Sequence, residues 1–240
     1  MKFSYQIAGA FAGLAAAVGL FTATPALADA VTFDASSLNQ PITLTYDGFS
    51  GSTPISGLTA STTFTLTGIN GNNYTFDYSV TNTSSAPITG SRVSSFAFNT
   101  DPTISSASST GAFSYTTLNS TYPNSINSID VCFKDAQTGS CAGGGNGGLT
   151  QGQTGTGSFT LTFSQPVSSL TLSDFFVRYQ SISGAGNITS ASGSGSLTST
   201  STGGTQVPEP GVLGLMAGGL VAVGLLRRRR TTARFAPAMA

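Results

Sequence analysis

The sequence contains no histidine and no tryptophan, and its 240 residues include only two cysteines. Without histidine, the chain lacks the base that most often generates a thiolate and the most common nitrogen ligand of zinc. Composition therefore excludes both a catalytic thiol and a zinc site. We expect no catalytic residue, no bound metal and no cofactor, and we predict that the protein is not an enzyme.

Charged residues are also scarce, at 8% of the chain. The formal net charge of zero combines basic ends with an acidic middle. Between Asp29 and Val207, eight aspartates outnumber the three bases Arg92, Lys134 and Arg178, which gives a net charge of −5. Nucleic-acid binding requires clustered lysines and arginines to neutralise phosphates. We therefore expect no nucleic-acid partner.

The first 28 residues have the features of a secretory signal peptide. Lys2 supplies a positive charge, residues 7–21 form an apolar core, and Ala26 and Ala28 form a small-x-small cleavage site. The alternative interpretation is an N-terminal membrane anchor. We expect cleavage after Ala28, so that an exported mature chain begins at Asp29.

The region that follows alternates polar and apolar residues. Serine and threonine make up 65 of the 179 residues from Asp29 to Val207, and they alternate with aromatic and branched side chains. This pattern predicts β-strands, whose successive side chains point to opposite faces. No window has helical periodicity, and we predict an all-β domain over residues 29–183, an antiparallel β-sandwich or jelly roll. We expect strands near residues 42–46, 61–69, 73–80, 92–98, 111–116 and 129–134, and two more within residues 157–182. The residues expected to face the core in two of these runs are Phe64, Leu66, Tyr74, Phe76, Tyr78 and Val80.

Two further segments follow the predicted domain. Residues 184–206 are rich in glycine, serine and threonine and have almost no apolar content, which predicts a flexible linker. Residues 211–226 are all apolar, and a helix of that length spans about 24 Å. We predict one C-terminal transmembrane helix there, with residues 231–240 as a cytoplasmic tail. The predicted stop-transfer residues are Arg227, Arg228, Arg229 and Arg230.

Pro208, Glu209 and Pro210 stand between the linker and the apolar helix. The tripeptide, the helix and the arginines, in this order, resemble the PEP-CTERM sorting signal of exopolysaccharide-producing Gram-negative bacteria. The resemblance covers residues 207–230. It implies that an exosortase, a membrane-embedded transpeptidase, recognises the tripeptide and processes the protein. It also implies export through the inner membrane, transient anchoring, and then location at the cell surface or outside the cell; the alternative is a plain membrane anchor.

A second similarity involves residues 131–141 and 174–182, which resemble the cistern subgroup of PEP-CTERM proteins. This similarity implies no activity for the domain.

Cys132 and Cys141 are separated by eight residues. Export brings the chain into an oxidising compartment, where two cysteines in one exported domain are expected to pair. We predict a Cys132–Cys141 disulfide, whose loop closure contributes roughly 2–3 kcal/mol of stability in the chain-entropy model.

The glycine-rich segment after Cys141 matches G-x-G-x-x-G at Gly143, Gly145 and Gly148. A phosphate site of this type needs a following helix, and no helical pattern follows. We therefore predict a mobile loop. Arg178 lies in the most apolar predicted strand, and we expect it to form a local ion pair with Asp174 or a rim contact. A ligand-orienting role is the alternative.

The aspartates are the remaining acid–base candidates. Aspartates in loops of this composition are usually turn residues that bond the local backbone. Two alternatives stay open: a glycosidase would need a facing pair such as Asp130 with Asp135 or Asp34 with Asp47, and loop aspartates can hold calcium.

These features favour an exported, non-enzymatic protein of the cell surface or extracellular matrix, associated with exopolysaccharide or biofilm. The alternative is a carbohydrate-binding module. Such modules stack sugar rings on exposed aromatic side chains, and the lack of tryptophan weakens that interpretation.

Overall fold

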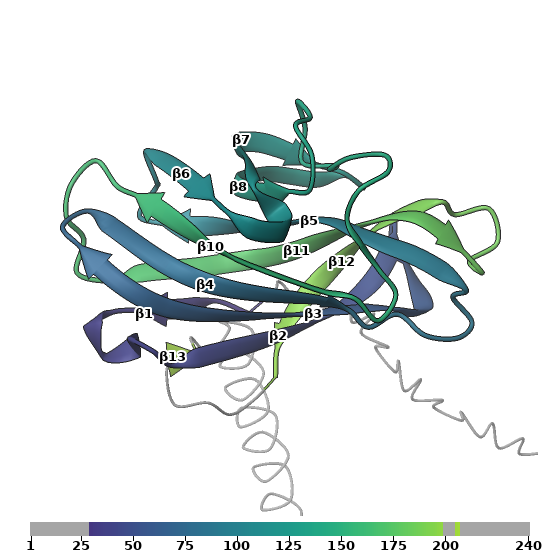
Figure 1. The fold of residues 1–240 in the computed structure, drawn as a ribbon, viewed down its shortest axis with the longest axis horizontal. Helices are drawn as coiled ribbons and strands as arrows, with labels where there is room; N and C mark the ends of the chain where they lie inside the picture. Colours follow the sequence, from purple (N-terminus) through teal and green to yellow (C-terminus); the bar gives the residue numbers. More distant parts are fainter. Residues whose placement is uncertain (1–28, 199–204, 207–240) are drawn as a thin grey trace, which may run out of the picture.

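The computed structural model of the protein describes residues 29–198 together with residues 205 and 206. These residues form thirteen β-strands and two short 3-10 helices, and they contain no α-helix (Figure 1). The all-β prediction is confirmed. The predicted signal peptide, sorting tripeptide, transmembrane helix, arginine cluster and tail lie outside the described residues.

In chain order the strands are β1 (Val31–Phe33), β2 (Pro41–Ser50), β3 (Thr53–Asn70), β4 (Asn73–Asn82), β5 (Gly90–Asp101), β6 (Ser106–Ser109), β7 (Tyr115–Tyr122), β8 (Ile126–Lys134), β9 (Leu149–Thr150), β10 (Thr154–Thr162), β11 (Leu170–Ser183), β12 (Ser190–Leu197) and β13 (Thr205–Gln206). The 3-10 helices are η1 (Ala35–Ser37) and η2 (Gly111–Phe113).

The strands form one antiparallel sheet with the order β6-β10-β4-β3-β2-β12-β11-β5-β8-β7. In addition, β1 pairs with β11 and β13, and β9 pairs with β5. The two ends of the order, β6 and β7, are consecutive in the chain and are connected through η2. The halves of the sheet face each other as in a sandwich, but the β2–β12 pairing makes them one continuous sheet that curves into a nearly closed barrel (Figure 1).

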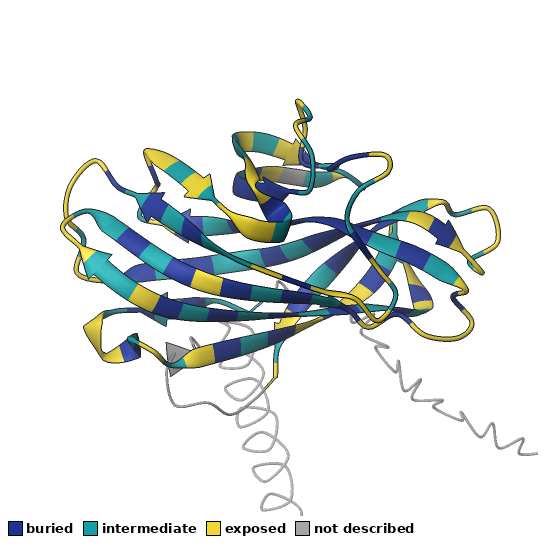
Figure 2. Ribbon diagram, in the orientation of Figure 1, coloured by how far each residue is buried: buried dark blue, intermediate teal, exposed yellow. Residues whose placement is uncertain are grey.

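The interior is filled with aromatic rings from both halves of the sheet. Phe159 of β10 stacks on Phe133 of β8 with ring centroids 4.8 Å apart, and Phe64 of β3 lies 6.2 Å from Phe175 of β11. Each buried aromatic side chain contributes roughly 1.5–3 kcal/mol through removal of apolar surface from water. All six residues predicted to face the core in the second and third runs are at most 3% exposed. Along these strands, buried residues alternate with residues that are mostly of intermediate exposure (Figure 2).

Strand β5 is buried on both faces in its central part. One face, with Phe96 and Phe98, contacts the aromatic interior. The other face contributes Ala97 to a smaller apolar cluster, which contains Tyr122, Ile129, Cys132 and Cys141. Tyr122, at the end of β7, and the segment that carries Cys141 therefore cover the outer face of β5, beside which β8 continues the sheet.

The predicted linker over residues 184–206 is wrong in its first part. Strand β12 pairs with both β11 and β2 near the middle of the sheet, and Ala191 is fully buried. Its low apolar content has a steric cause, because a Cβ at Gly193 or Gly195 would lie 2.9 or 2.8 Å from the rings of Tyr179 and Tyr46. The domain therefore extends beyond residue 183, at least to Thr198, whose N–H donates to Thr43 O.

The expected strand over residues 111–116 is also corrected. Residues 111–113 form η2, and β7 begins only at Tyr115. Gly111 has φ +81°, and a Cβ there would lie 2.1 Å from Thr156 O. The close approach of β10 therefore requires a glycine and a tight turn at this point, where alternation alone predicts a strand.

Candidate functional site

The two ends of the described domain lie on paired strands. In the β1–β13 pair, Val31 is opposite Gln206 and Thr32 is opposite Thr205. Asp29 Oδ2 also accepts a 2.7 Å hydrogen bond from Leu197 N. In sequence, Ala28 precedes Val31 by three residues, and Pro208 follows Gln206 by two. The predicted cleavage residues Ala26 and Ala28 and the sorting residues Pro208, Glu209 and Pro210 lie outside the described residues.

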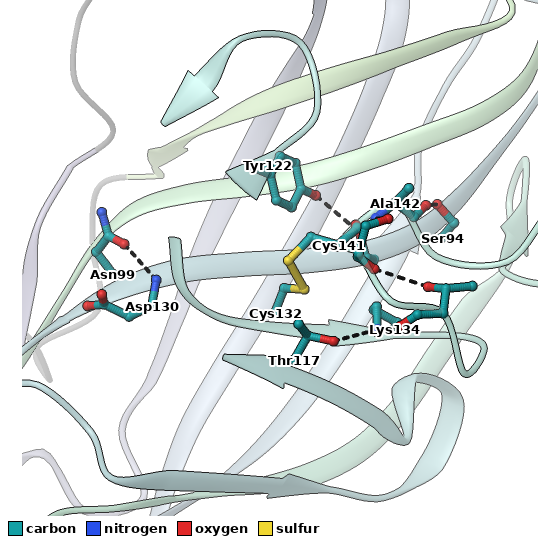
Figure 3. The surroundings of a disulfide bond; sticks show 12 residues. Ser94, Asn99, Thr117, Tyr122, Asp130, Cys132, Lys134, Cys141 and Ala142 are labelled. Carbon is teal, nitrogen blue, oxygen red and sulfur yellow. Dashed lines mark hydrogen bonds between the residues drawn. A yellow bond between two sulfur atoms is a disulfide. The ribbon is translucent and has the colours of Figure 1, made fainter. Parts of the chain in front are cut away.

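The predicted disulfide is confirmed. Cys132 and Cys141 are bonded, with Cα atoms 5.9 Å apart, and both residues are fully buried. Figure 3 shows the disulfide beside Tyr122. Cys141 O accepts a 2.6 Å hydrogen bond from Ser95 Oγ on β5, and that hydroxyl lies 3.2 Å from the Tyr122 hydroxyl. The disulfide therefore fixes the start of the glycine-rich segment against the outer face of β5.

Lys134 is enclosed by the loop that the disulfide closes. The side chain is 1% exposed, and Nζ donates to Thr117 Oγ1 at 2.5 Å and to Thr138 O (Figure 3). Burial lowers the pKa of Lys134 because it penalises the charged amine, and the charge of Asp135 acts in the opposite direction. The amine therefore holds the loop closed and is not presented to solvent.

The glycine-rich segment is held by hydrogen bonds, in contrast to the predicted mobile loop. Asp135 Oδ1 accepts a 2.6 Å hydrogen bond from Gly144 N. The Arg92 guanidinium donates to Gly145 O and Gly147 O. Strand β9 follows the segment, so the helix that a phosphate-binding glycine motif requires is absent here. The Gly144 N–H donates to the Asp135 carboxylate, so this N–H is not available to bind a phosphate.

A polar groove of about 430 Å³ opens beside Arg92, where β5, β9 and the end of β11 meet. It is lined by Thr89, Gly90, Ser91, Arg92, Thr150, Gln151 and Ser181. Neither a carboxylate nor an aromatic ring is among these residues. Ser181 has φ +50°, a left-handed conformation that is strained for a non-glycine residue, and its Oγ accepts a 2.9 Å hydrogen bond from Arg92 Nη2. No motif or pattern in the sequence predicts this groove.

Arg178 does not form the expected ion pair with Asp174. Asp174 Oδ2 accepts from Asn99 Nδ2 at 2.9 Å, whereas Arg178 is 8% exposed and its Nε and Nη1 atoms have no partner. Both residues belong to β11, which has a register shift between Ser173 and Phe176. Four residues along a strand span about 13 Å, which is too far for an ion pair. Burial lowers the pKa of Arg178, and neighbouring Tyr122 opposes that shift.

Three of the four aspartates in the candidate pairs, Asp130, Asp135 and Asp34, accept hydrogen bonds from protein groups. Asp130 Oδ2 accepts from Thr100 N at 2.8 Å, and Asp34 Oδ1 caps η1 by accepting from Ser36 N at 2.8 Å. Hydrogen bonds from the Ser36 hydroxyl and, second, from the Ser36 backbone N–H lower the pKa of Asp34. The described part of the chain contains no group of three or more potential metal-ligating side chains from His, Cys, Asp and Glu.

The family comparison identifies the C-terminal segment. Residues 206–230 match the model of the PEP-CTERM protein-sorting motif. No curated protein and no solved structure matches the chain. The protein therefore carries a PEP-CTERM sorting signal, which implies export, processing by an exosortase, and a transient membrane stage before the cell surface. No helix among the described residues is both long and apolar enough to span a membrane.

Proposed function

We propose that the protein is a non-enzymatic component of the cell surface or extracellular matrix, and that it associates with exopolysaccharide. The observation that carries this proposal is the PEP-CTERM motif at residues 206–230. A sorting signal of this kind delivers a protein to the outside of the cell, where the surrounding polymer is polysaccharide.

The outer face of the sheet supports this role. On β2, β3, β4 and β10, threonine hydroxyls lie side by side across neighbouring strands, as in the 2.9 Å Thr43–Thr63 contact and the 2.8 Å Thr81–Thr154 contact. Such a surface is rich in groups that both donate and accept hydrogen bonds. Sugar hydroxyls have the same capability, so the hydroxyls of a polysaccharide can replace water on this face at little cost.

A carbohydrate-binding module with one defined ligand is the second candidate, and the polar groove beside Arg92 favours it. The groove has no aromatic ring on which a pyranose can stack. A glycan array distinguishes the two functions: one defined ligand bound with micromolar affinity supports the module, and the absence of any such ligand supports the structural role.

The proposed function is tested by fractionating the native host. We expect the wild-type protein in the surface and matrix fractions, where it co-purifies with exopolysaccharide. A variant with Pro208, Glu209 and Pro210 replaced by alanine is expected to stay in the membrane fraction. Equal amounts of wild type and variant in the matrix, or wild-type protein that never co-purifies with polysaccharide, would contradict the proposal.

A further inference from the structure

We propose that the groove beside Arg92 binds the carboxylate of an acidic sugar unit, a uronic acid residue of an anionic polysaccharide. The proposal rests on the second candidate function, the carbohydrate-binding module, because it names the site and the class of glycan that such a module would bind. Charge, hydrogen-bond capacity and shape each support it.

The charge distribution identifies Arg92 as the base that can bind a ligand carboxylate. The three bases between Asp29 and Val207 are Arg92, Lys134 and Arg178, and the last two are only 1% and 8% exposed. Arg92 is half-buried with its guanidinium at the groove. No carboxylate lines the groove, and Arg92 makes no ion pair within the described part of the chain. In an acidic domain, this groove is therefore the place where a ligand carboxylate meets a positive charge with no partner of its own.

The guanidinium is held in place before any ligand arrives. Of its five N–H groups, three donate to Gly145 O, Gly147 O and Ser181 Oγ. Two N–H groups are left without an acceptor among the described residues. A guanidinium fixed in this way loses little conformational freedom on binding a carboxylate, and this favours affinity and a defined orientation.

The other groove residues suit a sugar better than a bare anion. Three exposed residues that carry hydroxyls line it, namely Thr89, Thr150 and Ser181. Gln151 Nε2 donates to Ile88 O and Ser84 O, which leaves its side-chain carbonyl free to accept from a sugar hydroxyl. The volume of about 430 Å³ lies within the usual range of small-ligand sites, and the groove is open to solvent, so a chain can continue out of it.

The test measures binding of oligosaccharides to the purified full-length protein by calorimetry or ligand-observed NMR. The probes are trigalacturonate, its neutral counterpart trigalactose, and acetate at matched ionic strength. We expect trigalacturonate to bind, and its affinity to fall as salt rises, because salt screens a partly exposed charge pair. Trigalactose and acetate are expected to bind at least tenfold more weakly.

Two variants examine the groove by different changes. Arg92→Gln removes the charge, and Thr150→Asp keeps Arg92 but places a carboxylate directly opposite it in the β5–β9 pair. Both are expected to weaken trigalacturonate binding at least tenfold. Thr121→Asp is the matched control, since Thr121 is exposed on β7 and does not line the groove; it is expected to bind like the wild type.

Each outcome is decisive. Unchanged binding in both groove variants would place the site elsewhere, equal binding of trigalactose would remove the role of the carboxylate, and equal binding of acetate would reduce the site to a general anion site. No binding of trigalacturonate by a folded wild-type protein would overturn the proposal. These results are independent of host fractionation, so failure of the groove site and failure of the proposed matrix function can be distinguished.

Discussion

At the scale of single residues, Arg178 is a buried charged side chain that lacks hydrogen-bond partners for two of its nitrogen atoms. Its Nε and Nη1 atoms are buried without an acceptor among the described residues, and no carboxylate in this part of the chain pairs with the guanidinium. Phe176 and Tyr122, whose rings are 5.8 Å apart, belong to the same small outer cluster. A buried cation without a partner lowers stability, because neither water nor an acceptor replaces its lost hydration.

We therefore predict that Arg178→Met stabilises the domain. A flexible apolar side chain of similar length removes the uncompensated charge and packs against the cluster, with an expected gain of about 1–3 kcal/mol in the free energy of unfolding. Arg178→Lys, which keeps the charge, is expected to show no gain. Urea denaturation of both variants measures the difference, and a clear loss of stability in Arg178→Met would mean that Arg178 has a partner in the folded protein.

The buried tyrosines lead to a prediction about alkaline pH. Burial raises the pKa of Tyr46 and Tyr122 far above 10, because the phenolate would be desolvated. Above pH 10 the unfolded chain loses these protons while the folded protein keeps them. The stability that the two neutral tyrosines contribute is therefore complete below pH 10 and is lost as pH rises further.

The variant Tyr122→Phe checks this directly. It removes one of the two groups, so the fall in unfolding free energy between pH 10 and pH 11.5 is expected to be shallower than in the wild type. Thermal melts across this range measure the slope. Tyr115→Phe is the control, because Tyr115 is the one large hydrophobic side chain exposed in the described domain. Equal slopes for Tyr122→Phe and the wild type would show that Tyr122 ionises freely in the folded state.

At the scale of elements, the disulfide and its loop form a cap on β5. We predict no free thiol in the exported protein without reduction. Replacing both cysteines by serine is expected to lower the melting temperature by roughly 2–4 °C per kcal/mol lost, from a loop-closure contribution of about 2–3 kcal/mol. The far-ultraviolet circular dichroism spectrum is expected to stay unchanged, because the aromatic interior does not depend on the cap.

Quantitative thiol labelling before and after reduction tests for free thiols. Paired thermal melts of the wild type and the double serine variant measure the fall in melting temperature. A single Cys132→Ser variant helps to separate the effects, since it breaks the bond but keeps Cys141 in the small cluster. Full labelling of Cys132 in protein that has never been reduced would contradict the disulfide in the exported protein.

Strand β12 supports a further prediction at this scale. A chain that ends at Ser183 lacks the strand that connects β2 to β11, so we expect it to remain unfolded or aggregate. A chain that ends at Thr198 retains every strand except β13 and is expected to fold cooperatively. Expression of both truncations, followed by thermal melts, compares them. A cooperative transition in the shorter chain would mean that the two halves of the sheet hold together without β12.

The strands that alternation identifies well are those with one aromatic face. In β4, the inward residues Tyr74, Phe76, Tyr78 and Val80 follow the expected period of two. In β12, the residues that face the interior are glycine and alanine, because Tyr46 and Tyr179 fill the space from neighbouring strands. Composition alone therefore makes β12 resemble a linker. When the neighbouring strands supply the large side chains, the strand itself carries small residues. Its sequence then shows no alternation of polar and large apolar residues.

At the scale of the whole molecule, the sorting signal and the disulfide could be predicted because each depends on local order in the sequence. The groove beside Arg92 could not. Its lining comes from the start of β5, from β9 and from the end of β11, which are far apart in the chain. Arg92 itself stands in an ordinary strand pattern, and its orientation depends on carbonyls more than fifty residues away.

The arrangement of the chain ends bears on processing of the whole molecule. Paired β1 and β13 bring the first residues after the predicted signal cleavage and the last residues before Pro208 to the same edge of the domain. The predicted apolar helix is short for the hydrocarbon core of a bilayer, which is about 30 Å thick, so it is a marginal anchor that four arginines keep in place. Two prolines around Glu209 disfavour helix at the tripeptide, because proline fixes φ and restricts the residue before it.

We therefore predict that an exosortase cuts near Pro208-Glu209-Pro210 while the folded domain stands outside the membrane. Mass spectrometry of protein from the native host is expected to find Asp29 at the N-terminus and no peptide from Val212 to Ala240. The control is the same host without its exosortase, in which those peptides are expected to appear in the membrane fraction. If most molecules keep the tail in a host that has an exosortase, the segment acts as a plain membrane anchor, since nothing then separates the domain from its helix.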